Sequence, residues 1–225
     1  MPNEAILPTI IGKVPLGIGS TIMKTVVAHY YNRNSYNEVY RNRDTLSGFE
    51  SGCVDRFLSS LNQSPHILDV GCGSGVPFGI NFISCGCLLD GIDISKKQIQ
   101  RARKNMPNAR CVNIDFLKYN TDIKYDGVSM LYSLFHMKRE YHPLALKKAY
   151  NLLNSNGIVL INIRREDSGN VKYRSNFCGN PMLWSHYQYK EFRKIAKDIG
   201  FKIEVLGDEY GNESSESHLW LLLKK

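Results

Sequence analysis

With 225 residues, the chain is long enough for one α/β domain with a single large core and a short N-terminal addition. Hydrophobic residues make up 43% of the sequence and aromatic residues 11%, so the composition excludes an intrinsically disordered chain. The formal net charge of +8 favours anionic partners such as RNA or an acidic membrane surface, but the basic residues are scattered along the chain.

The N-terminal part, residues 1–64, is predicted to be an arm with lid helices. Residues 5–28 are fairly apolar, but prolines, lysines and glycines interrupt them, so they fit neither a membrane span nor a secretory signal. This segment could close over a site or be a terminus without function, and the sequence leaves both open. The six cysteines include no CxxC pair and no zinc-ligand spacing, which predicts buried thiols in a reducing, cytoplasmic compartment.

Tyrosines are dense within this N-terminal part, at Tyr30, Tyr31 and Tyr36. They are candidate substrate-binding residues if the arm covers a site. They could equally be packing residues of an amphipathic helix, because a tyrosine ring is largely apolar.

From about residue 65, short apolar runs alternate with segments of helical periodicity. Strands are predicted over residues 66–71, 87–93, 109–114, 125–132, 157–163, 201–206 and 217–223, and helices over 96–105, 143–153 and 189–199. This alternation predicts a mainly parallel sheet covered on both faces. The Asn/Ser/Gly run at residues 154–157 predicts a turn before the fifth strand. Residues 164–188 are polar and too long for an ordinary loop, so we expect an insertion that builds a pocket.

A glycine-rich loop follows the first predicted strand, with Gly71, Gly73 and Gly75. Without side chains, the backbone can turn sharply there and approach a ligand closely. The dinucleotide fingerprint GxGxxG would need a glycine at position 76, where this chain has Val76 followed by Pro77. The spacing therefore predicts a cofactor loop and disfavours nicotinamide or flavin.

Acidic residues end the next two predicted strands. Asp93 lies at the distance along the chain where a carboxylate meets ribose hydroxyls. Asp115 closes the third strand, where it could accept a hydrogen bond from the exocyclic amine of adenine or cap the following turn. The sequence leaves both roles open for Asp115.

Together, ILDVGCGSG at residues 67–75 and GIDIS at residues 91–95 resemble the class I S-adenosylmethionine-dependent methyltransferases, over residues 65–225. The resemblance implies an α/β fold with a Rossmann-like, seven-stranded, mainly parallel sheet and an antiparallel last strand. It also implies S-adenosylmethionine as cofactor, bound by a set of residues from the loops that follow the strands: Asp69, Gly71, Cys72, Gly73, Gly75, Asp93, Ile94, Gln98, Asp115, Phe116 and Leu131. Two further strings, SLFHM at residues 133–137 and PMLWSHY at residues 181–187, resemble small-molecule methyltransferases.

Methyl transfer from a sulfonium is an in-line displacement, so alignment of the acceptor and exclusion of water contribute most to catalysis. A neutral histidine could take a proton from a nitrogen or oxygen acceptor, and His136 and His186 are the candidates. Either histidine could instead only shape the pocket or pack onto the core. Tyr132, Trp184 and Tyr187 join the N-terminal tyrosines as candidate substrate-binding residues.

The main alternative is an RNA methyltransferase that uses the basic surface. The densest basic group, at residues 96–104, has the spacing of one exposed helix face, which a solvated surface explains more simply. No acidic residue stands at Tyr132 or Ser133, where a metal-assisted enzyme of this family would want one, so we expect no metal. The sequence predicts a small-molecule acceptor, no membrane partner, and no particular oligomeric state.

Overall fold

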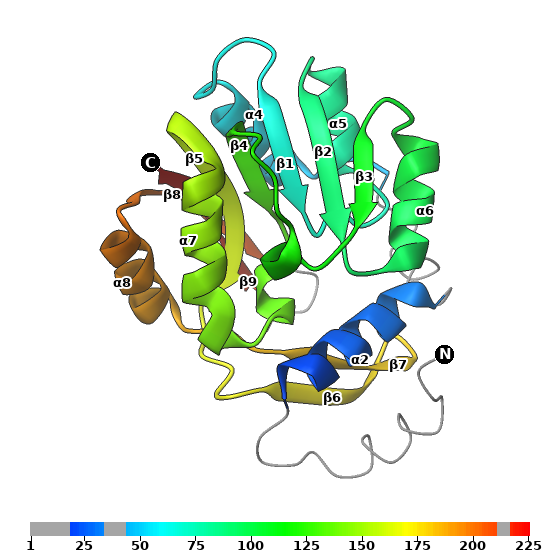
Figure 1. Ribbon diagram of the computed structural model, residues 1–225. Coiled ribbons are helices and arrows are strands. Elements are labelled where there is room, and N and C mark those ends of the chain that lie inside the picture. The colour runs from blue at the N-terminus through cyan, green and yellow to red at the C-terminus, as the bar shows by residue number, and fades with distance from the viewer. Residues whose placement is uncertain (1–18, 34–43, 211–216) are drawn as a thin grey trace.

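The computed structural model describes residues 19–33, 44–210 and 217–225, and these form a seven-stranded sheet with helices on both faces (Figure 1). The strand order is β3-β2-β1-β4-β5-β9-β8. The strands are β1 (His66–Val70), β2 (Leu88–Asp93), β3 (Arg110–Asn113), β4 (Tyr125–Met130), β5 (Leu153–Arg164), β8 (Lys202–Tyr210) and β9 (Ser217–Lys224). Strands β1 to β5 pair in parallel, whereas β9 is antiparallel to both β5 and β8. The predicted Rossmann-like α/β fold with an antiparallel last strand is confirmed.

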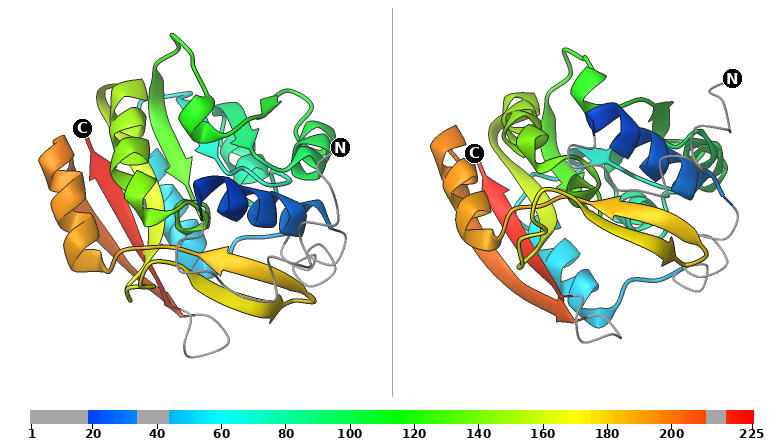
Figure 2. Two further views of the ribbon diagram at one scale, coloured as in Figure 1. Left: turned by 60° about the horizontal axis from the view of Figure 1, so that its bottom comes forward. Right: turned by 90° about the horizontal axis from the view of Figure 1, so that it is seen from below.

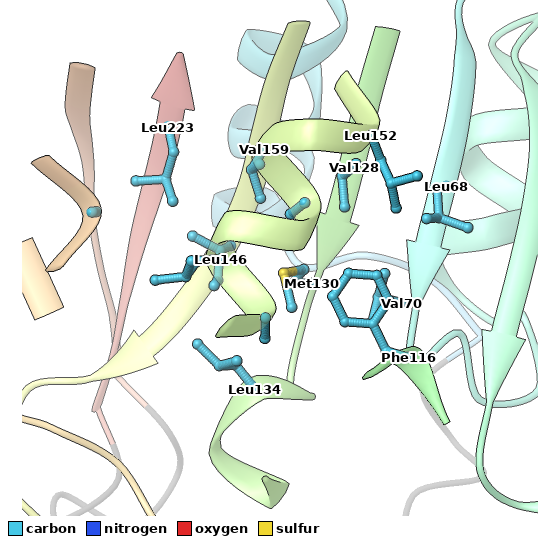
Figure 3. Packing of buried hydrophobic residues seen from close by; sticks show 14 of the residues in the cluster. Leu68, Val70, Phe116, Val128, Met130, Leu134, Leu146, Leu152, Val159 and Leu223 are labelled. Carbon is cyan, nitrogen blue, oxygen red and sulfur yellow. The ribbon is translucent and has the colours of Figure 1, made fainter. Parts of the chain in front are cut away.

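Successive side chains of β1 enter two different cores. Leu68 and Val70 belong to the cluster on one face of the sheet, and Ile67 belongs to the cluster on the other face. Figure 3 shows the first cluster, in which side chains of β1, β4 and β5 meet Leu146 and Leu152 of helix α7. Each buried aliphatic side chain contributes about 1.5–3 kcal/mol. Burial on both faces explains why the central strands are almost continuously apolar.

The helices that cover the sheet are α4 (Gly48–Leu58), α5 (Phe78–Ser84), α6 (Lys96–Asn105), α7 (His142–Leu152) and α8 (Tyr189–Ile199). Buried residues of α4, α5 and α6 pack on one face, and those of α7 and α8 pack on the other. In α6, the Ser95 hydroxyl accepts from the Gln98 amide at 3.2 Å, which caps the first turn. The basic residues predicted to share a helix face lie on this helix, while its Ile99 and Ala102 are buried.

A third layer crosses the carboxyl ends of the parallel strands. It consists of α2 (Ser20–Asn32) and a two-stranded hairpin, β6 (Lys172–Phe177) and β7 (Asn180–Trp184). Figures 1 and 2 show the blue helix and the yellow hairpin side by side beneath the ends of the strands. Their apolar side chains form a separate cluster with Phe135, so we call α2 and the hairpin the lid layer.

Two local features differ from the predicted elements. The turn expected at residues 154–157 lies inside β5, which begins at Leu153; Asn156 does adopt a left-handed φ of 65°, but as part of a register shift. The insertion at residues 164–188 contains the β6–β7 hairpin. Its polar composition hid the strands because β6 is largely exposed while β7 packs under α2.

None of the helices in the described ranges is both long enough and apolar enough to cross a lipid bilayer.

Candidate functional site

A large cleft lies between the carboxyl ends of the parallel strands and the lid layer. Loops after β1, β2, β3 and β4 line one side of it, and α2 and the hairpin line the other. In open α/β sheets, ligands bind where the strand order reverses, which here is between β1 and β4. The predicted residues that line it are Tyr31, Gly71, Cys72, Gly73, Asp93, Ile94, Gln98, Asp115, Phe116, Leu131, Tyr132, His136 and Trp184.

The glycine loop is fastened to the end of β2. The amides of Gly71 and Cys72 donate to the Ile92 carbonyl at 2.8 and 3.0 Å. Gly71 has φ of 80°, and a Cβ there would lie 2.5 Å from the Ser133 Cβ. A Cβ on Gly73, with φ of 56°, would meet no atom within 4 Å, so this part of the loop faces open space. The backbone therefore forms a cradle that a ligand can approach closely.

Asp93 stands beside this cradle with both oxygens held. Its Oδ2 accepts from the Gly73 amide at 3.0 Å, and its Oδ1 accepts from the Ser95 amide at 2.7 Å. Burial raises the pKa of its carboxyl to about 6, although these two bonds act in the opposite direction. The carboxylate is thus ionised at neutral pH and correctly oriented to accept bonds from hydroxyl groups.

Asp69 and Gly75 contact residues behind the glycine loop and do not line the cleft. Asp69 is buried, and its Oδ1 accepts from the Ser129 hydroxyl at 2.6 Å. Burial, with a contribution from the nearby Asp93 charge, raises the pKa of Asp69 to about 6. Gly75 has φ of 82°, which favours glycine, and a Cβ there would lie 2.4 Å from the Met106 Cε, so that flexible side chain would have to move.

The region beyond β2 and β3 combines apolar and acidic side chains. Ile94 and Phe116 line the cleft together with Asp115. Asp115 Oδ1 accepts from the Leu117 amide at 3.0 Å, which is the capping role that the sequence allowed. Its Oδ2 lies 2.5 Å from the Lys24 Nζ of α2. The carboxylate therefore caps a turn and also faces the cleft.

His136 follows β4 and contacts the lid layer. Its Nδ1 lies 3.3 Å from the Leu183 carbonyl oxygen, and its Nε2 lies 2.8 Å from the Tyr31 hydroxyl. A carbonyl can only accept, so Nδ1 carries the proton and Nε2 accepts from Tyr31. Burial lowers the pKa of His136 to about 4, so the imidazole is neutral at physiological pH. The Trp184 ring lies 6.3 Å away and completes the wall on the hairpin side.

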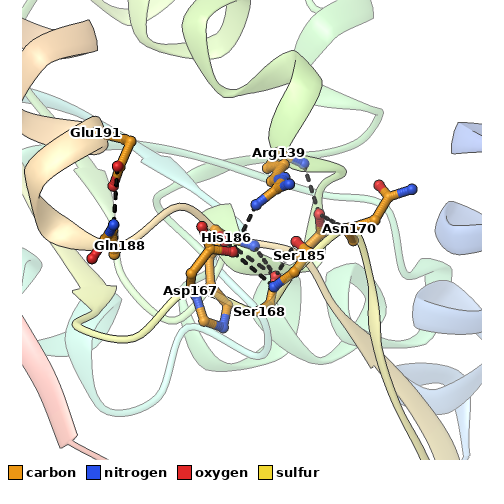
Figure 4. Close-up of polar contacts among 9 residues, drawn as sticks. Arg139, Asp167, Ser168, Asn170, Ser185, His186, Gln188 and Glu191 are labelled. Carbon is orange, nitrogen blue, oxygen red and sulfur yellow. Dashed lines mark hydrogen bonds and ion pairs between the residues drawn. The ribbon is translucent and has the colours of Figure 1, made fainter.

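Besides Asp69 and Gly75, three predicted residues lie away from this cleft, and a fourth lies outside the described residues. His186 and Tyr187 line a separate small cavity beside His142. Figure 4 shows His186 bonded to Ser168; the His186 amide donates to the Ser168 hydroxyl at 2.8 Å. Tyr30 is buried in the lid layer, and Tyr36 lies outside the described residues.

Several cleft residues were not predicted. Glu209 of β8 and His218 of β9 line the wall beyond Tyr132, and Lys24 lines the wall on α2. The Tyr132 hydroxyl contacts carboxylates of both Glu50, at 2.9 Å, and Glu209, which also accepts from the Trp220 Nε1 at 3.2 Å. Lys24 is far in sequence from Glu209 and His218, and no local motif of the sequence assigns a cleft position to any of the three.

Comparisons with known proteins identify a family and several relatives of the chain. A family model described as a methyltransferase domain matches residues 49–206. The carboxy-S-adenosyl-L-methionine synthase of Helicobacter pylori strain G27 is 29% identical over 153 residues, which cover 65% of this chain and 61% of that protein. The chain thus spans less than two thirds of the length of this relative. An uncharacterized protein of Methanocaldococcus jannaschii, MJ0906, is also 29% identical, over 66% of this chain and 43% of its own length.

Solved structures show the same fold. A 1,6-didemethyltoxoflavin-N1-methyltransferase of Burkholderia thailandensis, with bound 1,6-didemethyltoxoflavin and S-adenosylhomocysteine, has a TM-score of 0.73 at 15% identity, over 95% of this chain and 92% of that one. The magnesium protoporphyrin IX methyltransferase of Synechocystis, with bound S-adenosylhomocysteine, has a TM-score of 0.68 at 18% identity, over 90% of this chain and 99% of that one.

Proposed function

Because this chain belongs to the methyltransferase domain family, we propose that it transfers a methyl group from S-adenosylmethionine to a nitrogen or oxygen of a small-molecule acceptor. One observation carries the proposal. A single cleft holds both the glycine cradle with Asp93 and the Tyr31–His136 pair. The glycine cradle and Asp93 suit a nucleoside with an amino-acid tail. The Tyr31–His136 pair suits an acceptor that loses a proton.

The residues present fit the cofactor. Gly71, Cys72 and Gly73 would hold the methionine moiety, because the open space at Gly73 lets a ligand contact the backbone. Asp93 would accept bonds from the ribose hydroxyls, since its orientation is already set by two backbone amides. Ile94, Gln98 and Phe116 would surround the base, and the backbone near Leu131 would approach the cofactor. When bound, the cofactor supplies an electrophilic methyl group whose departure leaves a neutral thioether.

The acceptor would lie between the loop after β4 and the lid layer. Trp184 and Tyr132 line the cleft there and would enclose an organic ring or chain and keep water away from it. This arrangement aligns the acceptor for in-line attack, which is the main contribution that methyl transfer requires.

The hydrogen bond between Tyr31 and His136 offers a path for the proton of the acceptor. The acceptor N–H or O–H would donate to the Tyr31 oxygen while the Tyr31 proton moves to Nε2 of His136. The Leu183 carbonyl holds the imidazole so that Nε2 points to Tyr31. His136 would thus act through Tyr31 as a base.

Two measurements test the proposed function. Calorimetry should show binding of S-adenosylmethionine and S-adenosylhomocysteine and none of a nicotinamide dinucleotide; the opposite pattern would overturn the proposal. Incubation with methyl-labelled cofactor and a panel of small amines, phenols and carboxylates should label at least one acceptor. A carboxylated cofactor among the products would instead point to the activity named for the Helicobacter relative.

Salt dependence separates a small acceptor from RNA. Arg101 and Lys104 of α6 also line the cleft, so the basic surface of the chain reaches the site. The affinity for a small acceptor should change little between low and moderate salt. A steep loss of affinity for an RNA acceptor would favour the RNA methyltransferase, because counterion release scales with the number of phosphates contacted.

A further inference from the structure

One face of α2 points into the cleft, and it carries a charged residue near the predicted adenine site. Lys24, Val27 and Tyr31 all line the cleft, and their spacing places them on one side of the helix. Tyr31 contacts His136 in the acceptor half. Lys24 contacts Asp115 in the cofactor half, with 2.5 Å between Nζ and Oδ2. The helix thus reaches both halves of the cleft.

The position of α2 is set by further contacts beyond this ion pair. The Asn32 side-chain oxygen accepts from the Ser95 hydroxyl at 2.8 Å and from the Lys97 amide at 3.1 Å. These bonds tie the end of α2 to the loop after β2, close to Asp93. Lys24 is therefore presented to Asp115 by a helix that is fixed at its other end.

The ion pair is accessible from the cleft. The side chains of Lys24 and Asp115 are 31% and 14% exposed, and both line the cleft beside Ile94 and Phe116. A carboxylate next to an ammonium group presents a hydrogen-bond acceptor beside a donor. The edge of adenine presents the complementary pattern, because its exocyclic amine lies between two ring nitrogens, N1 and N7, that can only accept.

We propose that Lys24 donates to a ring nitrogen of the adenine base of the cofactor, next to the exocyclic amine from which Asp115 would accept. This inference rests on the proposed function, because the base belongs to S-adenosylmethionine. It makes Lys24 a specificity-determining residue carried by the lid layer.

The change in ligand affinity caused by one substitution distinguishes base recognition by Lys24 from a role in which Lys24 only shields Asp115. If Lys24 binds the base, Lys24→Met should weaken binding of S-adenosylhomocysteine by about tenfold or more, as expected for loss of a hydrogen bond from a charged donor. If Lys24 only shields Asp115, the same substitution should leave binding unchanged or tighten it, which would overturn the proposal. Lys118→Met is the matched control, because Lys118 is exposed and does not line the cleft.

Base analogues provide the second arm of the test. The wild-type protein should bind either the 1-deaza or the 7-deaza analogue of S-adenosylhomocysteine more weakly than the parent, and the Lys24→Met variant should bind that analogue and the parent equally. Equal binding of all three ligands by the wild-type protein would remove Lys24 from base recognition. Failure of the wild-type protein to bind S-adenosylhomocysteine at all would overturn the proposed function itself, so the two failures are distinguishable.

Discussion

Single residues of the cleft owe their protonation states to the fold around them. Burial raises the pKa of Asp93 to about 6 and lowers the pKa of His136 to about 4. At neutral pH the carboxylate is therefore charged and the imidazole is neutral. The bond from His136 to the Leu183 carbonyl also determines which ring nitrogen faces Tyr31. Both groups are thus in the state that hydroxyl binding and proton transfer require.

The proposed proton path predicts matched effects of two substitutions. His136→Asn and Tyr31→Phe should each lower kcat by roughly 10²-fold, because either change interrupts the path, while the affinity for S-adenosylhomocysteine is retained. In the wild-type protein, kcat should fall as the pH approaches the His136 pKa of about 4 from above, since a protonated imidazole cannot accept. Kinetics from pH 4 to pH 8 provide the measurement.

Tyr187→Phe is the control for these variants. Tyr187 lines the separate small cavity, so this substitution should leave kcat unchanged. An unaltered kcat and pH profile in the His136 variant would mean that alignment of the acceptor alone drives the reaction.

At the scale of elements, the glycine loop and the lid layer set the shape of the cleft. The loop turns through left-handed residues and packs against Ser133, which follows β4. The hairpin supplies Leu183 and Trp184 to the other side, where α2 covers them. The glycine loop and the lid layer are both held by contacts with other parts of the chain. A substitution in either one therefore tests those contacts as well as the local backbone.

Two glycines of the loop should differ in their tolerance of alanine. Both Gly71 and Gly73 have a positive φ, which costs an alanine about 1–2 kcal/mol. A Cβ at Gly71 would also overlap the Ser133 Cβ, whereas a Cβ at Gly73 meets open space. Gly71→Ala should therefore lower the free energy of unfolding in urea clearly more than Gly73→Ala. Equal losses would show that Ser133 moves aside without cost.

Gly73→Ala should nevertheless weaken the binding of S-adenosylhomocysteine, because the added methyl group would occupy the space proposed for the ligand. Calorimetry on the folded variant measures this, and retained affinity would place the methionine moiety elsewhere.

The hairpin should govern acceptor binding rather than cofactor binding. Trp184 lies 5.0 Å from the Phe177 ring and 6.3 Å from His136, on the lid side of the cleft. Trp184→Ala should raise KM for the acceptor while the affinity for S-adenosylhomocysteine is unchanged. Trp184→Phe should keep KM for the acceptor close to the wild-type value if an aromatic ring is what acceptor binding requires. Wild-type kinetics in the alanine variant would place the acceptor elsewhere.

At the scale of the whole molecule, the ionisable groups buried by the fold act on stability in opposite directions. His136, His142 and His186 each have a pKa lowered by burial from 6.5 to about 4. Between these values the unfolded chain binds more protons, so these histidines favour unfolding as the pH falls. Asp69 and Asp93, with pKa values raised from 3.8 to about 6, favour the folded state as the pH falls through that range.

The combined effect of these groups on the free energy of unfolding predicts that replacing a buried histidine makes the protein less sensitive to acid. Three histidines outweigh two carboxyls, so the free energy of unfolding should fall between pH 7 and pH 5 in the wild-type protein. His142 is buried outside the large cleft and bonds through Nε2 to the Met137 carbonyl at 3.0 Å, a bond that a glutamine amide can also donate. His142→Gln should lose less stability over this range in urea titrations. Equal losses in the two proteins would show that His142 does not titrate on unfolding.

Local patterns in the sequence were sufficient to predict the fold and the family. Alternating apolar runs and helical periodicity indicate a covered parallel sheet, because each pattern is set by residues within a few positions of one another. The spacing of Gly71, Gly73 and Gly75 and the position of Asp93 indicate a cofactor loop for the same reason. The polar hairpin was missed because one of its strands is exposed and the other is covered by α2, which no local periodicity reports.

The partners within the cleft were decided only by the tertiary structure. Tyr31 and His136 are 105 residues apart, and Lys24 and Asp115 are 91 residues apart, so neither pair forms a pattern in the sequence. Trp184 and His186 are two positions apart, yet Trp184 lines the large cleft and His186 lines a separate cavity. The chain leaves the hairpin between them and turns back toward α8, which directs the two side chains into different spaces. Long-range packing, rather than proximity in the chain, determines which candidate residues can act together.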